Sequence, residues 1–414
     1  MTPKLTYNFG FLKESRYLLL LNVTEQLFFF TVFLVFARKF SVESYGQLIT
    51  LFTLANVFIT LFNLGLPVYL QREVSISNEN PTLLLSRILS LNILVLFFYL
   101  ILTFLYYKLF YGSVSFKLYM VTVIPVYLYS NINLLNSVLS GLRKYKVQFK
   151  LLLNSRVITI LAFLVFTVFY NSSLKLLLVI YSLGFLYHVI LLAVNIVKAD
   201  GKFAFSFNLK VLTGIIKISL PLGLAVIFNF LYDKIDILLI SKFTDFSQVG
   251  YYNIGYGIYK ASSFAFSFLL ISGLTHVSYL SRRNSAVKLF FKKYALWFLF
   301  IGIILNVILF FASDFMIKLI YTDKFSNSVF ILKIVSFAVI GLALNNLTGM
   351  ILNGLGLFRE NMYVTFTGLI INIILNIIFI PLYGIVAAAV ISVITEYFIF
   401  YGDYYFIKIF LNPE

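Results

Sequence analysis

The sequence contains no cysteine and only two histidines. The absence of cysteine excludes disulfide bonds, thiolate catalysis and cysteine-ligated metals. His188 and His276 lie far apart in the sequence and lack the close His spacing of zinc sites. A metal centre is therefore not expected. His188 lies in a Tyr- and Leu-rich segment, and we expect it to be a hydrogen-bonded packing residue.

Charged residues are also scarce. They make up 11% of this chain, whereas a soluble globular protein has roughly 25%. Hydrophobic residues make up 61%, and they include 48 Phe and 29 Tyr. With so few charged residues, a soluble fold could not cover so much apolar surface. The composition therefore excludes an ordinary cytosolic enzyme, a disordered chain and a secreted module. The composition predicts an all-α, polytopic integral membrane protein.

Acidic residues are outnumbered by basic ones, 15 against 32, which gives a formal net charge of +17. In a soluble protein such an excess would suit nucleic-acid binding. In a membrane protein, Lys and Arg instead collect in cytoplasmic loops. The positions of the basic residues decide between these two readings.

Twelve segments are long and apolar enough to span a membrane, which takes about 20 residues. The charge-free run 361–395 is too long for one span, and Pro381 and Gly384 divide it. The twelve predicted helices are 17–37, 46–70, 86–107, 117–141, 151–170, 174–197, 211–240, 249–280, 289–311, 328–356, 361–381 and 384–407.

The basic residues are distributed unequally between the two membrane sides. With a cytoplasmic N-terminus, 21 of the 32 lie on the inner side and nine on the outer side, while Lys234 and Lys260 lie within helices. This asymmetry predicts that both termini are cytoplasmic and that nucleic acid is not a partner. We expect part of the inner set to bind anionic lipid. The inner set includes Arg143, Lys144, Lys146, Lys150, Lys4, Arg156, Lys202, Arg282 and Arg283.

A short internal repeat supports a division into halves. Lys39-Phe40-Ser41 followed by Gly46 recurs as Lys242-Phe243-Thr244 followed by Gly250. Six predicted helices lie on either side of the basic segment 198–217. We therefore expect two pseudo-symmetric six-helix lobes, 1–205 and 206–414, with a substrate path between them. The connections are short, so no globular catalytic domain and no enzymatic activity are expected.

Three stretches carry a family resemblance. The first runs from Ala37-Arg38-Lys39-Phe40 to Tyr45-Gly46, Gly65-Leu66-Pro67 and Arg72. The second runs from Leu220-Pro221-Leu222-Gly223 to Asp236, Lys242 and Val249-Gly250-Tyr251-Tyr252. The third runs from Asn353-Gly354-Leu355 through Asn372 and Asn376 to Ile380-Pro381-Leu382-Tyr383-Gly384 and Ala387. Together and in this order they resemble the polysaccharide-lipid flippases of the multidrug/oligosaccharidyl-lipid/polysaccharide (MOP) exporter superfamily. Ala387 stands where glycine is common in that family.

The resemblance implies a transporter that works by alternating access. Its substrate would be an undecaprenyl-diphosphate-linked oligosaccharide, such as an O-antigen repeat unit used in lipopolysaccharide biosynthesis. It would move this lipid from the cytoplasmic to the periplasmic leaflet of a bacterial inner membrane. The implied partners are the lipid-linked oligosaccharide, membrane lipids and other polysaccharide-assembly membrane proteins. No cofactor is expected, but coupling to H⁺ or Na⁺ is.

Lys234 and Lys260 are the main candidates for binding the substrate headgroup, because charges inside membrane helices are costly and usually face a cavity or a partner. Tyr252, Tyr256 and Lys260 follow one another at intervals of four and share a helix face. Aromatic rings pack on sugars and an ammonium group binds phosphate. The alternatives are a chance Tyr stripe and an ion pair of Lys260 with Asp233 or Asp236.

Arg38 and Arg72 are further candidates for headgroup contact, because both belong to the family-like stretches. Both also lie at predicted helix ends, where snorkelling to the membrane surface explains an arginine equally well.

Four acidic residues within predicted helices are candidates for ion coupling: Glu25, Asp233, Asp236 and Glu396. A buried carboxylate can bind H⁺ or Na⁺, but it can also form an interhelical ion pair or hydrogen bond. Glu25 is the first to test, because no cation lies within a helical turn of it.

Three other functions compete with the flippase. A cation-coupled drug or small-molecule exporter of the same superfamily would use Asp233 and Asp236 for its cation. A membrane polysaccharide polymerase would need a large external catalytic loop, and the outer loops here are short. A sugar or metabolite facilitator would carry a G-x-x-x-D-R-x-G-R-R loop after the second helix, which residues 71–80 lack.

Overall fold

The computed structural model describes residues 9–77, 79–170, 172–200, 205, 207–280 and 284–411. Four basic residues assigned above to the inner side, Lys4, Lys202, Arg282 and Arg283, lie outside these ranges. The described chain is helical, which confirms the predicted all-α class. Its elements are α1 (Phe9–Lys39), α2 (Val42–Asn63), α3 (Leu66–Ile76), α4 (Pro81–Phe110), α5 (Phe116–Gly141), α6 (Tyr145–Phe169), α7 (Leu174–Asp200), α8 (Leu209–Phe243), α9 (Phe246–Ala261), α10 (Phe264–Leu280), α11 (Asn284–Tyr321), the short 3₁₀ helix η1 (Asp323–Phe325), α12 (Asn327–Ser336), α13 (Ala338–Gly354), α14 (Phe358–Tyr383) and α15 (Ile385–Leu411).

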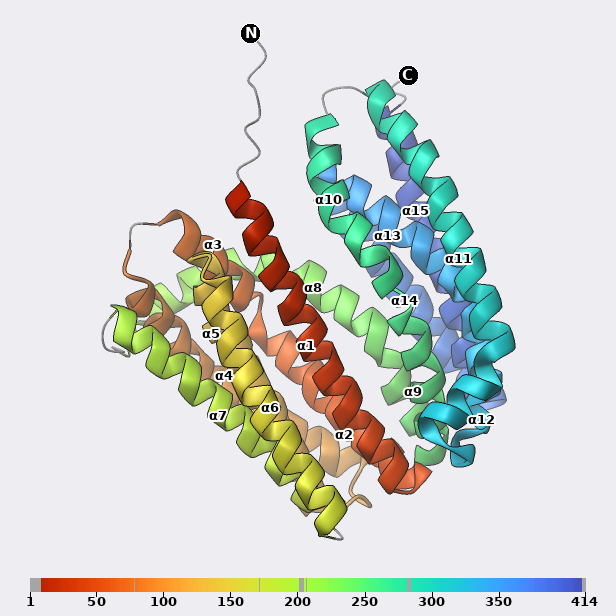
Figure 1. Cartoon of the computed structure of the whole chain (residues 1–414), viewed down its shortest axis with the longest axis horizontal. Helices are drawn as coiled ribbons and strands as arrows, with labels where there is room; N and C mark the ends of the chain where they lie inside the picture. The colour runs from red at the N-terminus through yellow and green to blue at the C-terminus, as the bar shows by residue number, and fades with distance from the viewer. Residues whose placement is uncertain are drawn as a thin grey trace. The chain divides into compact units, whose positions relative to one another are not determined.

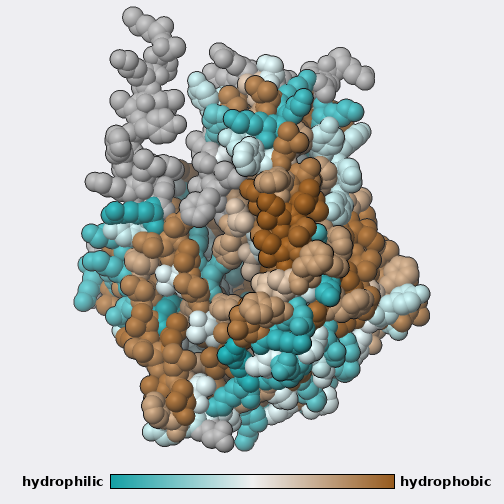
Figure 2. All heavy atoms as spheres, turned by 45° about the vertical axis from the view of Figure 1, so that its right-hand side comes forward, coloured by the Kyte–Doolittle hydropathy of each residue, from teal (hydrophilic) through white to brown (hydrophobic). Residues whose placement is uncertain are grey.

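The helices are suited to a membrane. Within the described ranges, nine are long and apolar enough to span one, or up to eleven if each of two bent pairs counts as one span. The predicted segment 249–280 corresponds to α9 and α10, which are not among these eleven. Large apolar side chains on α11 are exposed, among them Phe311 and Leu289. The side of the molecule that carries α11 comes forward in Figure 2, where hydrophobic residues form a band with hydrophilic residues above and below it. Such a band matches the hydrocarbon layer of a bilayer.

Each predicted segment coincides with one helix or with a pair of helices, and the pairs arise from breaks that periodicity did not reveal. Segment 46–70 is divided into α2 and α3 at Leu64 and Gly65, which both have positive φ. Segments 249–280 and 328–356 are each divided near a single turn, at Ser262 and at Phe337. The break at Pro381 and Gly384 was predicted and is confirmed. There the Gly384 amide donates to the Ile380 carbonyl at 2.8 Å, and α14 ends.

The contacts divide the chain into two compact units. The first unit contains Met1–Lys39 and Leu54–Ile227, and the second contains Phe40–Thr53 and Phe228–Glu414. These units differ from the expected lobes 1–205 and 206–414 in two stretches: 40–53 packs within the second unit and 206–227 within the first. The lobe boundary therefore stays a prediction that rests on the internal repeat.

The two glycines of the internal repeat lie against each other in the second unit. A Cβ atom on Gly46 would lie 1.7 Å from the Phe246 carbonyl oxygen, and one on Gly250 would lie 2.9 Å from the Val42 carbonyl oxygen. Only glycine lets the backbones of α2 and α9 approach so closely. This crossing is the local reason why the beginning of α2 packs with the second unit.

Each unit has its own packing order (Figure 1). In the first unit, α6 packs against α1 and α7, and α7 packs against α5. In the second unit, α15 packs against α13 and α14, and α13 also packs against α10 and α11. α15 is a central helix of the second unit, and it carries two of that unit's buried carboxylates, Glu396 and Asp403.

Candidate substrate and ion site

The second unit brings together seven of the ten residues singled out in the sequence. They come from three helices that are far apart in the chain. α8 supplies Asp233, Lys234 and Asp236, α9 supplies Tyr252, Tyr256 and Lys260, and α15 supplies Glu396. The other three, Glu25, Arg38 and Arg72, belong to the first unit.

Four of these side chains form an ion-pair cluster. The Lys260 ammonium lies 3.2 Å from a carboxylate oxygen of Asp233 and 3.2 Å from one of Glu396. The Lys234 ammonium lies 2.8 Å from the other oxygen of Asp233. Two lysines and two carboxylates therefore neutralise one another, as buried charges within membrane helices generally must. Of the two partners foreseen for Lys260, Asp233 is found and Asp236 is not, while Glu396 was not foreseen.

Tyrosines surround the Lys260 ammonium, which lies 5.3–5.8 Å from the ring centres of Tyr232, Tyr256 and Tyr259. The Tyr259 hydroxyl donates to Glu396 at 2.8 Å. Cation–π attraction and hydrogen bonding thus add to the ion pairs. Lys260 is held in place from several sides.

Lys234 is bound less tightly. Its side chain is 34% exposed, and Asp233, its one ion-pair partner among the described residues, also binds Lys260. Asp233 would keep a cation if Lys234 turned toward another anion. Of the two predicted headgroup lysines, Lys234 is the one that can change partner at low cost.

Asp236 lies in a separate, uncharged network. It is buried, and it accepts hydrogen bonds from Tyr252 at 2.8 Å, Ser392 at 3.2 Å and Asn376 at 2.8 Å. The Asn376 amide also donates to Asn372 at 3.0 Å. In the described part of the chain, Asp236 has no ion-pair partner. A buried carboxylate surrounded by neutral oxygen and amide groups can hold a small cation.

The predicted tyrosine stripe contributes to both networks. Tyr252 and Tyr256 stack at 5.3 Å between ring centres. Both are buried, and their hydroxyls donate to Asp236 and Asp233 respectively. Here the tyrosines bind the carboxylates, and their contact with sugar stays a prediction.

Glu25 has a cation after all, from another helix. Arg156 on α6 binds it through two nitrogens, each 2.8 Å from a carboxylate oxygen. The arginine is 1% exposed and lies over the rings of Phe28 and Phe185 at 4.6 and 4.7 Å. The absence of a cation on the helix of Glu25 therefore did not mean that its charge is unbalanced. A bidentate Arg–carboxylate pair is strong, and it favours a structural role for Glu25.

Two expectations about the first unit need correction. Arg156 was assigned to the inner membrane side, but it lies midway along α6 and is buried. Its partner Glu25, 131 positions away, explains why a charge is tolerated there. His188 is buried as expected, but neither of its ring nitrogens has a hydrogen-bond partner among the described residues.

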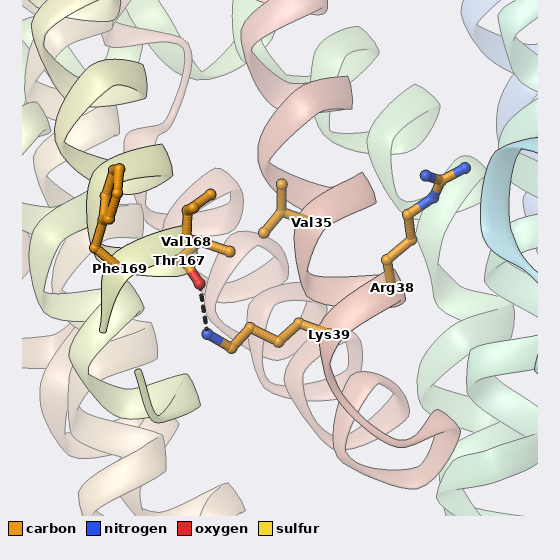
Figure 3. Close-up of a pocket in the computed structure, with 6 residues that line it drawn as sticks. All are labelled: Val35, Arg38, Lys39, Thr167, Val168 and Phe169. Atoms are coloured by element: carbon orange, nitrogen blue, oxygen red, sulfur yellow. Dashed lines mark hydrogen bonds between the residues drawn. The ribbon is translucent and has the colours of Figure 1, made fainter. Parts of the chain in front are cut away.

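Arg38 and Arg72 belong to the first unit, whereas the residues of both networks belong to the second. Arg38 lines an open pocket of about 730 Å³ with Val35, Lys39, Thr167, Val168 and Phe169. In Figure 3, Lys39 reaches the Thr167 carbonyl, a hydrogen bond of 3.2 Å, whereas Arg38 points away from it. Arg72 on α3 is exposed, with Glu73 at 3.5 Å.

Sequence reasoning missed several partners in these networks. Ser392 on α15 donates to Asp236, and Thr348 on α13 lies 3.1 Å from a carboxyl oxygen of Asp403, but serine and threonine are too common in membrane helices to stand out. Asp403 lies near the end of the last predicted segment, where a charge appeared ordinary. The signal that could have identified it is its position within a helix that has few other charges. Among the described residues, no group of three or more His, Cys, Asp or Glu side chains could hold a metal ion.

Two family profiles match the sequence of this chain. The profile of the family described as "Polysaccharide biosynthesis protein" matches residues 11–274, and the profile described as "MatE" matches residues 221–378. No curated protein matches the sequence of the chain.

Solved structures share the fold. The lipid II flippase MurJ, in an inward closed conformation, is 18% identical with a TM-score of 0.74, over 94% of this chain and 87% of that chain. An inward-facing multidrug resistance MATE family transporter of the MOP superfamily is 12% identical with a TM-score of 0.73, over 92% and 94%. The Vibrio cholerae MATE transporter VcmN in the bent form is 11% identical with a TM-score of 0.61, over 97% and 96%.

At these identities the structural likeness concerns the fold, and the family follows from the sequence profile. Because that profile covers well over half of the sequence, the chain belongs to the polysaccharide biosynthesis protein family of the MOP exporter superfamily, as a multi-pass membrane protein with a transporter fold.

Proposed function

We propose that this protein is a flippase for an undecaprenyl-diphosphate-linked oligosaccharide, such as an O-antigen repeat unit. It moves the lipid from the cytoplasmic to the periplasmic leaflet of a bacterial inner membrane by alternating access, with both termini in the cytoplasm. The observation that carries the proposal is the match of residues 11–274 to polysaccharide biosynthesis proteins. The shared fold with a lipid II flippase supports it, since that architecture serves to flip a lipid.

In this proposal, Lys234 contacts the diphosphate. Its ammonium is partly exposed, and its partner Asp233 keeps Lys260 when Lys234 turns away. Lys260 holds Asp233 and Glu396 together and positions α8, α9 and α15. Tyr252 and Tyr256 contact sugar only after their hydrogen bonds to carboxylates break. Arg38 and Arg72 would contact the headgroup at other stages of transport.

Asp236 binds the coupling cation, either H⁺ or Na⁺. The support is that Asp236 is buried and receives only neutral donors, from Tyr252, Ser392 and Asn376. Cation binding would relieve the cost of its buried charge. Glu25, Asp233 and Glu396 are less suited to this task, because each already has a lysine or arginine partner.

Translocation in proteoliposomes tests the headgroup contact. Lys234→Ala removes one charge-assisted hydrogen bond, which contributes about 1.5–3 kcal/mol. The expected result is a loss of roughly tenfold or more in the translocation of a lipid-linked oligosaccharide. Lys318→Ala, at an exposed i,i+4 pair with Asp314, is the matched control and should retain wild-type translocation. Equal rates for the two variants would remove Lys234 from the substrate path.

The same vesicles test the coupling ion. A proton or sodium gradient should accelerate translocation by the wild type, and Asp236→Asn should abolish this acceleration. If Asp236→Asn responds to the gradient as the wild type does, the cation binds elsewhere.

A cation-coupled small-molecule exporter is the second candidate. The observation in its favour is the MatE match over residues 221–378, a stretch that contains Asp236 and Asn376. An exporter predicts greater drug sensitivity on deletion with no accumulation of lipid-linked sugar, whereas a flippase predicts the reverse.

A further inference from the structure

Asp403 on α15 is a buried carboxyl group that the proposed transport site does not use. Its side chain is 1% exposed. One carboxyl oxygen, Oδ2, lies 3.1 Å from the Thr348 hydroxyl on α13. The other, Oδ1, is buried without any hydrogen-bond partner among the described residues. An unpaired acidic group in the interior of a membrane protein requires an explanation.

Charged groups near this part of α15 do not neutralise Asp403. Asp403 forms no ion pair with any described residue, and α13 carries no titratable side chain at all. Glu396, two turns earlier on α15, is occupied by Lys260. The charged and titratable side chains on the other helices packed against α15 are Arg359, Glu360, Tyr363 and Tyr383 of α14, Lys288, Lys292, Lys293, Tyr294, Asp314, Lys318 and Tyr321 of α11, Lys333 of α12, and Tyr251, Tyr252, Tyr256, Tyr259 and Lys260 of α9.

The hydrogen bonds open to the Thr348 hydroxyl bear on the protonation state of Asp403. The Thr348 hydroxyl lies 3.1 Å from both the Asn345 carbonyl oxygen and Asp403 Oδ2, and it can donate to only one of them. An ionised Asp403 would compete with the Asn345 carbonyl for that single proton, and its Oδ1 atom would still lack a hydrogen-bond donor among the described residues. A protonated Asp403 can donate to the Thr348 oxygen while Thr348 donates to Asn345, and both protons then have acceptors.

We propose that Asp403 is a proton-binding site, whose carboxyl group is neutral in this conformation and releases its proton when water reaches it. A bound sodium ion would need several oxygen ligands. Among the described residues, the Thr348 hydroxyl is the side-chain group hydrogen-bonded to Asp403, and the Asn361 amide and Asp403 Oδ2 both lie 3.8 Å from where a Cβ on Gly349 would be. The ligand that fits this sparse set is a proton.

Polar side chains extend from Asp403 in two directions. Toward the end of α13, Asn361 donates to Asn353 at 3.1 Å, close to the turn between α13 and α14. Toward the ion-pair cluster, the Thr348 hydroxyl contacts the backbone carbonyl of Asn345, and the side-chain amide of the same residue donates to Glu396 at 2.9 Å. Protonation at Asp403 is thereby connected to the surroundings of Lys260. That the proton drives transport rests on the function proposed above, but its binding to Asp403 does not.

Infrared spectroscopy of the full-length protein in lipid nanodiscs tests the site without any substrate. The expected result at neutral pH is a carbonyl band of a protonated carboxylic acid that Asp403→Asn removes. Asp314→Asn is the matched control, because Asp314 is 56% exposed and forms an ion pair with Lys318, and the band should stay in this variant. Persistence of the whole band in folded Asp403→Asn would overturn the proposal.

A second variant keeps the test valid if Asp403→Asn does not fold. Thr348→Val removes the hydroxyl but leaves the carboxyl, so the band should shift to higher frequency and remain present. An unshifted band would show that Asp403 does not donate to Thr348 and would overturn the assigned hydrogen-bond order.

The transport function can fail separately from this site. A wild-type protein that shows the band but translocates no lipid-linked oligosaccharide would contradict the proposed flippase and support the proton site. In a working flippase, where Asp403 would be a second proton site beside Asp236, Asp403→Asn should weaken the dependence of translocation on a pH gradient. Unchanged dependence in that variant would contradict the coupling role of the proton.

Discussion

The ion-pair partners of each charged side chain within the helices decide whether that side chain can bind a ligand. Lys260 is held by two carboxylates and three aromatic rings, whereas Lys234 shares one carboxylate and is partly exposed. Glu25 is bound at two points by a buried arginine. A charge fixed in this way stabilises the bundle, and a charge with a single shared partner is available for a ligand.

The pair of Glu25 and Arg156 leads to a prediction about stability. Glu25→Gln leaves a buried arginine without its counter-charge, which typically costs about 3–5 kcal/mol. We expect a loss of this size in the free energy of unfolding, measured in detergent micelles. Adding Arg156→Met to Glu25→Gln should recover most of it.

Glu73→Gln is the control for this measurement. Its partner Arg72 is exposed and 3.5 Å away, so the loss should stay below about 1 kcal/mol. If Glu25→Gln costs no more than Glu73→Gln, the buried pair does not stabilise the first unit.

The residues of the site could be predicted from sequence only as single polar side chains. Intramembrane charge alone identified Lys234, Lys260, Asp233, Asp236 and Glu396, because such charges are rare. The pair of Lys260 with Asp233 was among the alternatives foreseen. The pairs made over longer separations could not be predicted, since Glu396 lies 136 positions from Lys260 and Arg156 lies 131 from Glu25. The roles of Asp403 and Ser392 could not be predicted either, because they depend on side chains of the helices packed against them.

At the scale of helices, composition predicted the spans and local geometry decided their breaks. The predicted span 46–70 is apolar throughout its centre, yet the structure divides it into two helices, α2 and α3. Gly65 at φ 74° makes that break, and a Cβ there would lie 2.5 Å from the Gly223 nitrogen. Because such approaches depend on a second helix, hydrophobic periodicity does not reveal them.

The contact of α2 with α9 gives a prediction at the same scale. Gly46→Ala places a Cβ against the Phe246 carbonyl, so the two helices must separate. Overpacking of this kind costs about 1–3 kcal/mol or more, and we expect a lower midpoint of thermal unfolding.

Gly257→Ala on α9 is the matched control for this substitution. A Cβ there meets nothing within 4 Å, and alanine favours a helix by about 1 kcal/mol. This variant should unfold at or above the wild-type temperature. If Gly46→Ala matches Gly257→Ala, the close crossing does not exist in the membrane.

For the whole molecule, the predicted topology offers an explanation for the excess of positive charge. With a cytoplasmic N-terminus, the basic residues on the predicted inner side outnumber those on the outer side, and the removal of Arg156 from the inner set leaves that inequality in place. Composition and charge thus predicted a multi-pass membrane protein, and the sequence profile identifies its family. The substrate follows from neither, because sugar hydroxyls can be bound by almost any polar side chain.

The most direct test of the flippase proposal is a mass analysis of lipid-linked intermediates on each membrane face, in a deletion strain with and without the restored gene. We predict that undecaprenyl-diphosphate-linked repeat units accumulate on the cytoplasmic face of the deletion strain and reach the periplasmic face when the gene is restored. Unpolymerised repeat units on the periplasmic face of the deletion strain would instead identify a missing polymerase and contradict the flippase proposal.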